Sequence, residues 1–376
     1  MQRSMDETEI LVEESGVSKR EGFDFLTAFK YAGAIIALLI GSGFATGQEI
    51  VQYFTAFGWY GVLSIGLMFI LLSYVMIEFM RAGKAERFEN GNDIFYYYGG
   101  KIIGAFYDYF SIFFIFLTFT VMIAGAGATG EQQFGWPIYY GGIAIGILAI
   151  LTCITGLTKI VDIIGAIGPV IAVLAIILGI MSIVMYFPEL TQVSQNLAKY
   201  PVMKASPNWV LSSLSYVGFS LVLLAAFLSQ IGKNSKSMIN AKAGAIMGAS
   251  GFSLAIFIGY LGLLAALPLI AGSQIPNLVI AANINPRFAF IFSILIFAGI
   301  FTTTVPLLWS VVARFSKEET PKFRVLTVFV GILGIVVGLL MKFDKLVNIV
   351  YVLNGYVGIF LIVLMLVKTF TRKKKA

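Results

Sequence analysis

Long apolar stretches alternate with short polar connections along this chain, after a polar segment of 22 residues. A membrane-spanning helix needs about 20 apolar residues, because the hydrocarbon core is about 30 Å thick and each residue rises 1.5 Å. Residues 170–180 show none of the apolar–polar alternation that is typical of outer-membrane strands. The pattern therefore predicts an all-α polytopic membrane protein. Its ten predicted transmembrane helices cover about residues 30–55, 58–80, 101–127, 137–155, 162–187, 209–231, 243–271, 287–313, 323–341 and 346–368.

The polar segments at the two ends of the chain divide it into three predicted regions. Residues 1–22 are acidic and lack the features of a signal peptide, so we expect a flexible cytoplasmic N-terminal tail. Residues 23–370 form the predicted transmembrane transporter domain, and residues 371–376 form a basic cytoplasmic C-terminal tail.

Charge is scarce and unevenly placed. Only 12% of the 376 residues are charged, against about 25% in a soluble domain. With the N-terminus inside and ten spans, 21 of the 26 basic residues face the cytoplasm, as the positive-inside rule requires. The net charge of +7 thus reflects topology rather than nucleic-acid binding. We predict a multi-pass protein of the plasma (inner) membrane with both termini cytoplasmic. Its expected partners are the lipid bilayer and a small-molecule substrate, and its oligomeric state stays open. The five remaining basic residues are Lys199, Lys204, Arg287, Lys342 and Lys345.

The residue inventory disfavours catalysis. Histidine is absent and Cys153 is the single cysteine, which excludes histidine-based acid–base chemistry, a cysteine metal cluster and an intrachain disulfide. Asp108 and Glu49 lie on different spans, and Asp108 is expected to pair with a basic residue at the inner rim such as Lys159. We therefore predict that the protein is not an enzyme and has no cofactor, apart from a sodium ion as the coupling ion.

The first span carries a glycine-rich polar motif at mid-membrane depth, which runs Gly-Ser-Gly-Phe-Ala-Thr-Gly-Gln-Glu over 41–49. Each glycine weakens a helix by about 1 kcal/mol relative to alanine. Backbone that leaves the helix survives in a membrane only where protein or a water-filled cavity covers it. The motif predicts a broken helix, and the alternative is a packing face built on Gly43 and Gly47.

The sixth span repeats this texture, with serines and a glycine over 212–220. Spans one and six are five apart, and interrupted helices at matching positions of inverted halves indicate the binding site of secondary transporters. The sequence therefore predicts two inverted repeats, about 30–187 and 209–368, with broken helices 1 and 6.

Three motifs carry a resemblance that covers residues 25–370, namely 41–49, Ile-Ala-Gly-Ala-Gly-Ala at 123–128 and Ser-Tyr-Val-Gly-Phe at 215–219. With them the chain resembles the YkvI-like bacterial membrane protein family, which has the LeuT fold of the amino acid–polyamine–organocation superfamily. The resemblance implies a 5+5 inverted repeat and coupled solute transport, and it supplies no substrate.

The predicted function is secondary active transport of a small solute, such as an amino acid or a similar zwitterion, by sodium- or proton-coupled alternating access. The alternative is a solute-sensing receptor subunit on the same scaffold, without net transport. Helix-end N–H groups near Gly43 and Gly218 are expected to hold a carboxylate. The predicted substrate-binding residues are Gly41, Ser42, Gly43, Phe44, Thr46, Phe116, Thr120, Ser215, Gly218 and Phe219.

Three consecutive threonines in span eight suggest the ion site. The resemblance implies that a sodium ion binds carbonyl and hydroxyl oxygens from spans one and eight. Span five has no lysine at that depth, which favours sodium over a proton, although Glu49 could itself carry a coupling proton. The alternative is that the threonine hydroxyls bond back to carbonyls one turn earlier in their own helix. The register of the site also stays open, because a carbonyl ligand at Ala298 instead of Gly299 would place Phe301 at one of the two hydroxyl positions. The predicted ion-coupling residues are Ala37, Ile40, Gly299, Thr302, Thr303 and Glu49, of which all except Glu49 form the possible sodium site.

Overall fold

The computed structural model describes residues 22–155, 161–318 and 320–373, and within these ranges every regular element is a helix. Of the predicted tails, residues 1–21 and 374–376 lie outside these ranges, as does Lys159, whereas residues 371–373 belong to the last helix. The α-helices are α2 Phe25–Leu39, α3 Ser42–Thr46, α4 Gln48–Tyr53, α5 Tyr60–Glu86, α6 Asp93–Phe134, α7 Ile138–Thr155, α8 Val161–Met185, α9 Val193–Lys199, α10 Trp209–Asn234, α11 Met238–Ala265, α12 Leu267–Ile270, α13 Pro276–Ile284, α14 Pro286–Ala313, α15 Pro321–Gly338 and α16 Phe343–Lys373.

Each of the ten predicted stretches falls on one of these helices or on a short series of them. Eight of the described helices are long and apolar enough to cross a membrane, and a bent pair, 169–185 with 187–199, would make a ninth. The helix α2 is apolar but has only 15 residues. The structure thus supports a multi-pass membrane protein, and the count of ten spans stays a prediction.

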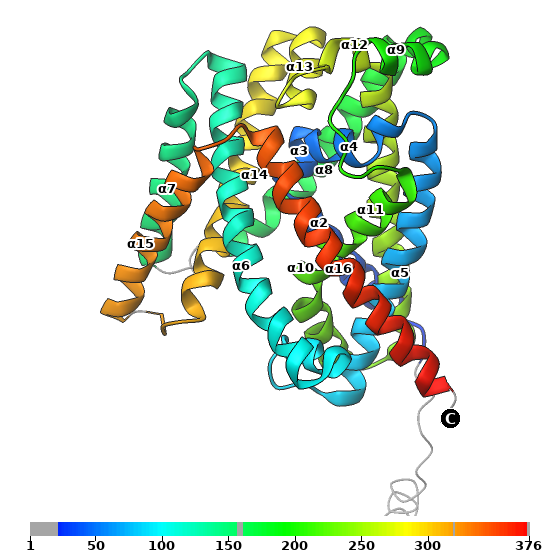
Figure 1. Ribbon diagram of the computed structural model, residues 1–376, viewed down its shortest axis with the longest axis vertical. Coiled ribbons are helices and arrows are strands. Elements are labelled where there is room, and N and C mark those ends of the chain that lie inside the picture. The colour runs from blue at the N-terminus through cyan, green and yellow to red at the C-terminus, as the bar shows by residue number, and fades with distance from the viewer. Residues whose placement is uncertain (1–21, 156–160, 319, 374–376) are drawn as a thin grey trace, which may run out of the picture.

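The helices form two groups (Figure 1). In one group α11 packs on α2 and α5, and α5 packs along α10. In the other, α6, α7, α14 and α15 pack on one another. The helix α16 contacts both α10 and α6, and α8 contacts both α11 and α14, so these two helices join the groups.

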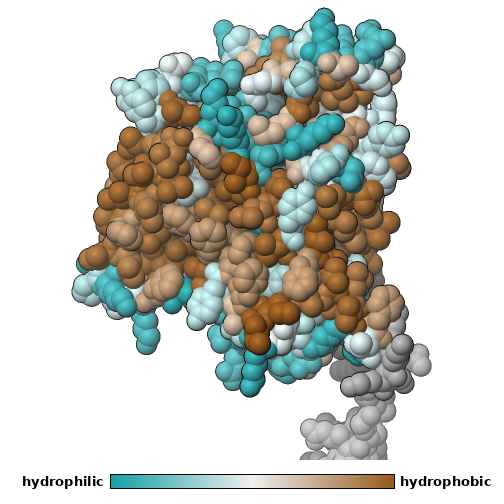
Figure 2. Space-filling model, in the orientation of Figure 1, coloured by the Kyte–Doolittle hydropathy of each residue, from teal (hydrophilic) through white to brown (hydrophobic). Residues whose placement is uncertain are grey.

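On the face that Figure 2 shows, apolar side chains cover much of the middle of the molecule, and hydrophilic side chains gather at its two ends. Large apolar side chains point outward from several helices, as at Ile102, Val184 and Val325, which are 87%, 74% and 68% exposed. Such a surface is stable against lipid chains rather than water. The short helices α9, α12 and α13 lie at the end opposite the C-terminus (Figure 1).

The predicted break in the sixth span is wrong, because α10 is one uninterrupted helix of 26 residues. Ser212, Ser213 and Ser220 donate to backbone carbonyls, and Ser220 Oγ bonds to the Tyr216 carbonyl of its own helix at 2.9 Å. Gly218 provides close helix packing instead of a break. A Cβ atom there would overlap the Gly355 carbonyl oxygen of α16 and lie 3.0 Å from the Ile359 nitrogen.

Asp108 and Cys153 both form hydrogen bonds within the second helix group. Asp108 of α6 forms a salt bridge of 2.5 Å with Arg314 at the end of α14, and it also accepts a hydrogen bond of 2.8 Å from Asn92. Arg314 is thus the partner in the described part of the chain, in place of the expected Lys159. Cys153 of α7 is buried, and its thiol donates to the Val305 carbonyl of α14 at 3.4 Å.

Candidate functional site

The first span is interrupted within the glycine-rich motif. The helix α2 ends at Leu39, Ile40 has a non-helical ψ of 88°, and the short helix α3 begins only at Ser42. A second interruption lies at Gly47, whose φ of 80° is a left-handed conformation that glycine adopts at little cost. The motif therefore divides the span into three helical pieces, α2, α3 and α4.

The short helix α13 holds the interrupted segment in place. The Asn277 side-chain nitrogen donates to the carbonyls of Phe44 and Ala45 at 3.3 and 3.0 Å. A Cβ atom at Gly47 would lie 2.7 Å from the Asn277 side-chain oxygen, so this position has room only for glycine. Carbonyls that the interruption frees are thus paired, as buried backbone groups require. Asn277 was missed in the sequence because no local pattern links it to span one.

A cavity of about 320 Å³ lies beside the interruption, between the two helix groups. Its wall combines the end of α2 with α14, α6, α8 and α10. All five residues of the predicted sodium site contribute to this wall. The lining residues are Ala37, Leu38, Ile40, Gly41, Ile115, Thr118, Ile171, Leu223, Gly299, Thr302, Thr303, Pro306, Leu307 and Ser310.

The span-eight threonines are hydrogen-bonded to their own helix. Thr302 Oγ1 and Thr303 Oγ1 both donate to the Gly299 carbonyl, at 3.0 and 2.9 Å. The two hydroxyl oxygens and the Gly299 carbonyl oxygen thus lie together on α14, and Ala37 and Ile40 contribute to the wall of the same cavity. Carbonyl and hydroxyl oxygens are the ligands that sodium finds in broken-helix transporters, so the residues present fit this ion. These bonds are also the hydrogen bonds to the preceding turn that the alternative interpretation of the threonines predicts. Sodium binding stays a prediction.

Glu49 of α4 lines a second, smaller cavity of about 30 Å³. The residue is only 8% exposed, and its carboxyl group lies against Gly43, where a Cβ atom would overlap Oε2 and lie 3.2 Å from Cδ. The hydroxyl of Tyr216 is within hydrogen-bonding reach. The two cavities share Leu38 and Leu223 in their walls, so they are neighbours.

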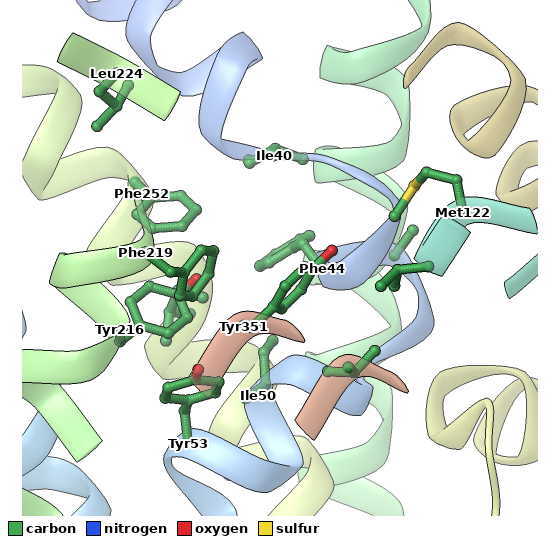
Figure 3. Close-up of a cluster of buried hydrophobic side chains, with 14 of the residues drawn as sticks. Ile40, Phe44, Ile50, Tyr53, Met122, Tyr216, Phe219, Leu224, Phe252 and Tyr351 are labelled. Atoms are coloured by element: carbon green, nitrogen blue, oxygen red, sulfur yellow. The ribbon is translucent and has the colours of Figure 1, made fainter. Parts of the chain in front are cut away.

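Aromatic side chains surround this part of the molecule (Figure 3). The ring of Tyr216 lies 4.9 Å from that of Phe219 and 5.2 Å from that of Tyr53, between centroids. The ring of Tyr351, from α16, stacks on Phe219 at 4.9 Å. The buried ring of Phe44 lies in the same cluster. The motifs of spans one and six thus meet here, as their positions in the sequence predicted, although Tyr351 had no sequence signal.

Three of the remaining predicted substrate residues, Thr46, Ser215 and Gly218, line neither cavity. Thr46 Oγ1 donates to the Gly43 carbonyl at 2.9 Å, which is a contact within the interrupted segment. Ser215 is buried against Gly355 of α16. Gly218 lines neither cavity, for the packing reason given above. The side chain of Ser42 is outside the described part of the structure.

On α6 the cavity is lined by a different face from the one predicted. Ile115 and Thr118 contribute to the wall, whereas Phe116 and Thr120 do not. Thr120 Oγ1 donates to its own helix, and its carbonyl lies 2.6 Å from the position of a Cβ atom at Gly338 of α15. The apolar composition of this span identified the helix but gave no way to choose its cavity-facing side.

Known proteins resemble this chain in sequence and in fold. No family model matches the chain. The membrane protein YkvI of Bacillus subtilis (strain 168) is 26% identical over 351 residues, which cover 92% of this chain and 96% of YkvI. A crystal structure of MhsT in complex with L-phenylalanine has a TM-score of 0.54 at 18% identity and covers 92% of this chain and 89% of MhsT. A manganese transporter variant from Eremococcus coleocola has a TM-score of 0.57 at 15% identity, and the match covers 94% of this chain and 80% of the transporter chain.

These similarities confirm the resemblance to YkvI-like proteins and the LeuT-type fold. Of these two solved neighbours, one is described as a manganese transporter and the other was solved with bound L-phenylalanine. At such low identity these solved structures show the fold alone.

Proposed function

We propose that this protein is a secondary active transporter of a small solute, such as an amino acid or a similar zwitterion. The observation that carries the proposal is the interruption of the first span beside a 320 Å³ cavity. Non-helical backbone at membrane depth is stable only where protein or a water-filled cavity covers it, and transporters place their binding sites at such breaks. The similarity to a manganese transporter and to the complex of MhsT with L-phenylalanine supports the same function.

The arrangement of the helices suggests how access would alternate. The cavity wall takes α2 and α10 from one group and α6 and α14 from the other. Rocking of α2, α5, α10 and α11 against the second group would widen or close this space. A coupling ion that binds one arrangement better than the other would shift the population between them.

Polar contacts link α4 to α16 in this structure. Gln52 of α4 donates to the Asp344 carbonyl of α16 at 2.8 Å and accepts from Asn348 at 3.0 Å. The cavity extends along α14 as far as Ser310, close to the basic end of that helix at Arg314. With the orientation predicted from the basic residues, this arrangement would face the cytoplasm.

Sodium is the coupling ion that we propose, bound by the carbonyls of Ala37, Ile40 and Gly299 with the hydroxyls of Thr302 and Thr303. A proton on Glu49 is the alternative coupling, because a buried carboxylate is stable only when it is neutralised. Both routes use residues that line the two neighbouring cavities.

Uptake into proteoliposomes tests the function. The full-length protein is reconstituted, and uptake of a panel of labelled amino acids and amines is measured with an inward sodium gradient, an inward proton gradient or neither. We expect gradient-driven accumulation of at least one solute above empty liposomes. Binding without flux under every gradient would contradict transport and favour the sensor function.

A further inference from the structure

We propose that Glu49 and the cavity around it recognise a primary ammonium group, so that the solute is a primary amine with an apolar body. This inference rests on the proposed function and specifies the chemistry of the same site. Its basis is a buried carboxylate that has no cationic partner among the described residues and lies beside an aromatic and apolar wall.

The charge of the site is the first step. Glu49 is buried, with only 8% of its surface exposed. In the described part of the chain no salt bridge joins it to a lysine or an arginine. None of the described residues that line either cavity is basic. An isolated buried carboxylate costs several kcal/mol unless a cation or a proton neutralises it. A ligand with a positive group would therefore gain most of its binding energy at this carboxylate.

Because α10 is unbroken, it lacks the free N–H groups near Gly218 that were expected to bind the carboxylate of the solute. In an uninterrupted helix the Gly218 N–H is bonded to the preceding turn, so it is not free to bind a carboxylate. The pieces α3 and α4 have five and six residues, too short for a strong helix dipole. Among the described residues that line the two cavities, Glu49 is the one charged side chain, so the anchor for a charged group of the solute is an anchor for a cation.

The size of the small cavity selects the cationic group. A volume of 30 Å³ is room for about one or two water molecules. A primary ammonium group is similar in size and donates three hydrogen bonds, whereas a trimethylammonium group is several times larger and donates none. The rings of Tyr216 and Phe219 form part of the wall and can add a cation–π contribution.

The neighbouring cavity would hold the rest of the solute. It has about 320 Å³ and borders the small cavity at Leu38 and Leu223. Its wall is mainly apolar, with Ile115, Ile171 and Leu307 among its residues. An apolar body with a terminal ammonium group matches these two volumes, and 2-phenylethylamine is a suitable probe.

Binding measurements on the purified full-length protein test the proposal. Isothermal titration with 2-phenylethylamine is compared with its trimethylammonium analogue, with 2-phenylethanol and with L-phenylalanine. We expect binding of the primary amine and at least tenfold weaker binding of the trimethylammonium analogue and the alcohol. The variant Glu49→Gln should weaken amine binding by about ten- to hundredfold, because a charge-assisted hydrogen bond is lost. The exposed Glu89→Gln variant is the matched control and should bind as the wild type does.

Three results would overturn the proposal. They are unchanged amine binding by Glu49→Gln, equal binding of the trimethylammonium analogue, and binding of L-phenylalanine without any binding of the amine. Flux measurements keep the two proposals separate. Glu49-dependent amine binding without uptake would contradict transport alone, whereas gradient-driven uptake that Glu49→Gln leaves unchanged would contradict the amine site alone.

Discussion

Substitution of Gly43 by alanine gives a direct test of the contact between the interrupted span and Glu49. The new Cβ atom would overlap Glu49 Oε2 and lie 3.2 Å from Cδ and 3.7 Å from Cβ of that side chain. The three nearest atoms to this position all belong to the Glu49 side chain, so the far end of one flexible side chain absorbs the change. We expect the carboxyl group to rotate away from Gly43 while the fold is kept.

The size of the effect follows from that displacement. A rotation of the side chain away from its preferred rotamer costs about 0.5–1.5 kcal/mol, so the loss of stability should be small. Ligand binding should suffer more, because the carboxylate leaves the position from which it reaches the small cavity. Loss of a charge-assisted hydrogen bond of about 1.5 kcal/mol corresponds to about tenfold weaker binding of 2-phenylethylamine.

The assay combines thermal unfolding in detergent with titration of the amine. Gly66→Ala is the matched control, because Gly66 lies on α5 with open space around its Cβ position. A double-mutant cycle adds Gly43→Ala to Glu49→Gln. If Gly43 acts through the carboxylate, the second substitution should change binding by less than about 0.5 kcal/mol in that background. Full additivity of the two effects, or normal binding by Gly43→Ala alone, would refute the reasoning.

Four further predictions concern the helices around the site. Thr303→Val should weaken the sodium dependence of uptake and leave sodium-independent binding intact, and an unchanged sodium response would show that the cation site is wrong. Gly218→Ala should lower stability by about 1–3 kcal/mol in thermal unfolding, because a Cβ atom overlaps α16; an unaltered melting temperature would contradict this packing role. Asp108→Asn should cost about 1–2 kcal/mol because it weakens the pair with Arg314, whose side chain is 42% exposed, and the double variant with Arg314→Gln should add little. Asn277→Ala should speed amide hydrogen exchange in residues 42–47, since two carbonyls lose their donor; unchanged exchange there would argue against the clamp.

Local composition was enough to locate the helices. The apolar stretches coincide with described helices because helix length and apolarity are set by consecutive residues. The break in span one was also predictable, since Gly41 and Gly47 stand at the two interruptions and glycine tolerates such backbone.

The same composition led to the wrong conclusion in span six. Glycine and serine within a membrane helix have two uses, and only tertiary contacts distinguish them. Gly218 faces Gly355, which lies 137 positions further along the chain, and Ser220 bonds to its own helix. Close helix packing therefore explains the residues that suggested a second break.

Residues that reach the site from distant helices were not predictable one by one. Thr118 was missed in favour of Thr120 because the rotation of α6 about its axis depends on the contact with α15. Asn277 and Tyr351 come from elements whose place beside span one is set by the fold and not by a motif.

The single thiol of the chain makes the native protein a ready background for labelling. Cys153 is buried between α7 and α14 and its sulfur is already hydrogen-bonded, so water-soluble maleimides have little access to it. A cysteine introduced at Leu307, in the wall of the large cavity, would thus be the main reactive site without removal of the native one. The rate of its modification, with and without a solute or sodium, would follow the opening of the cavity in a membrane.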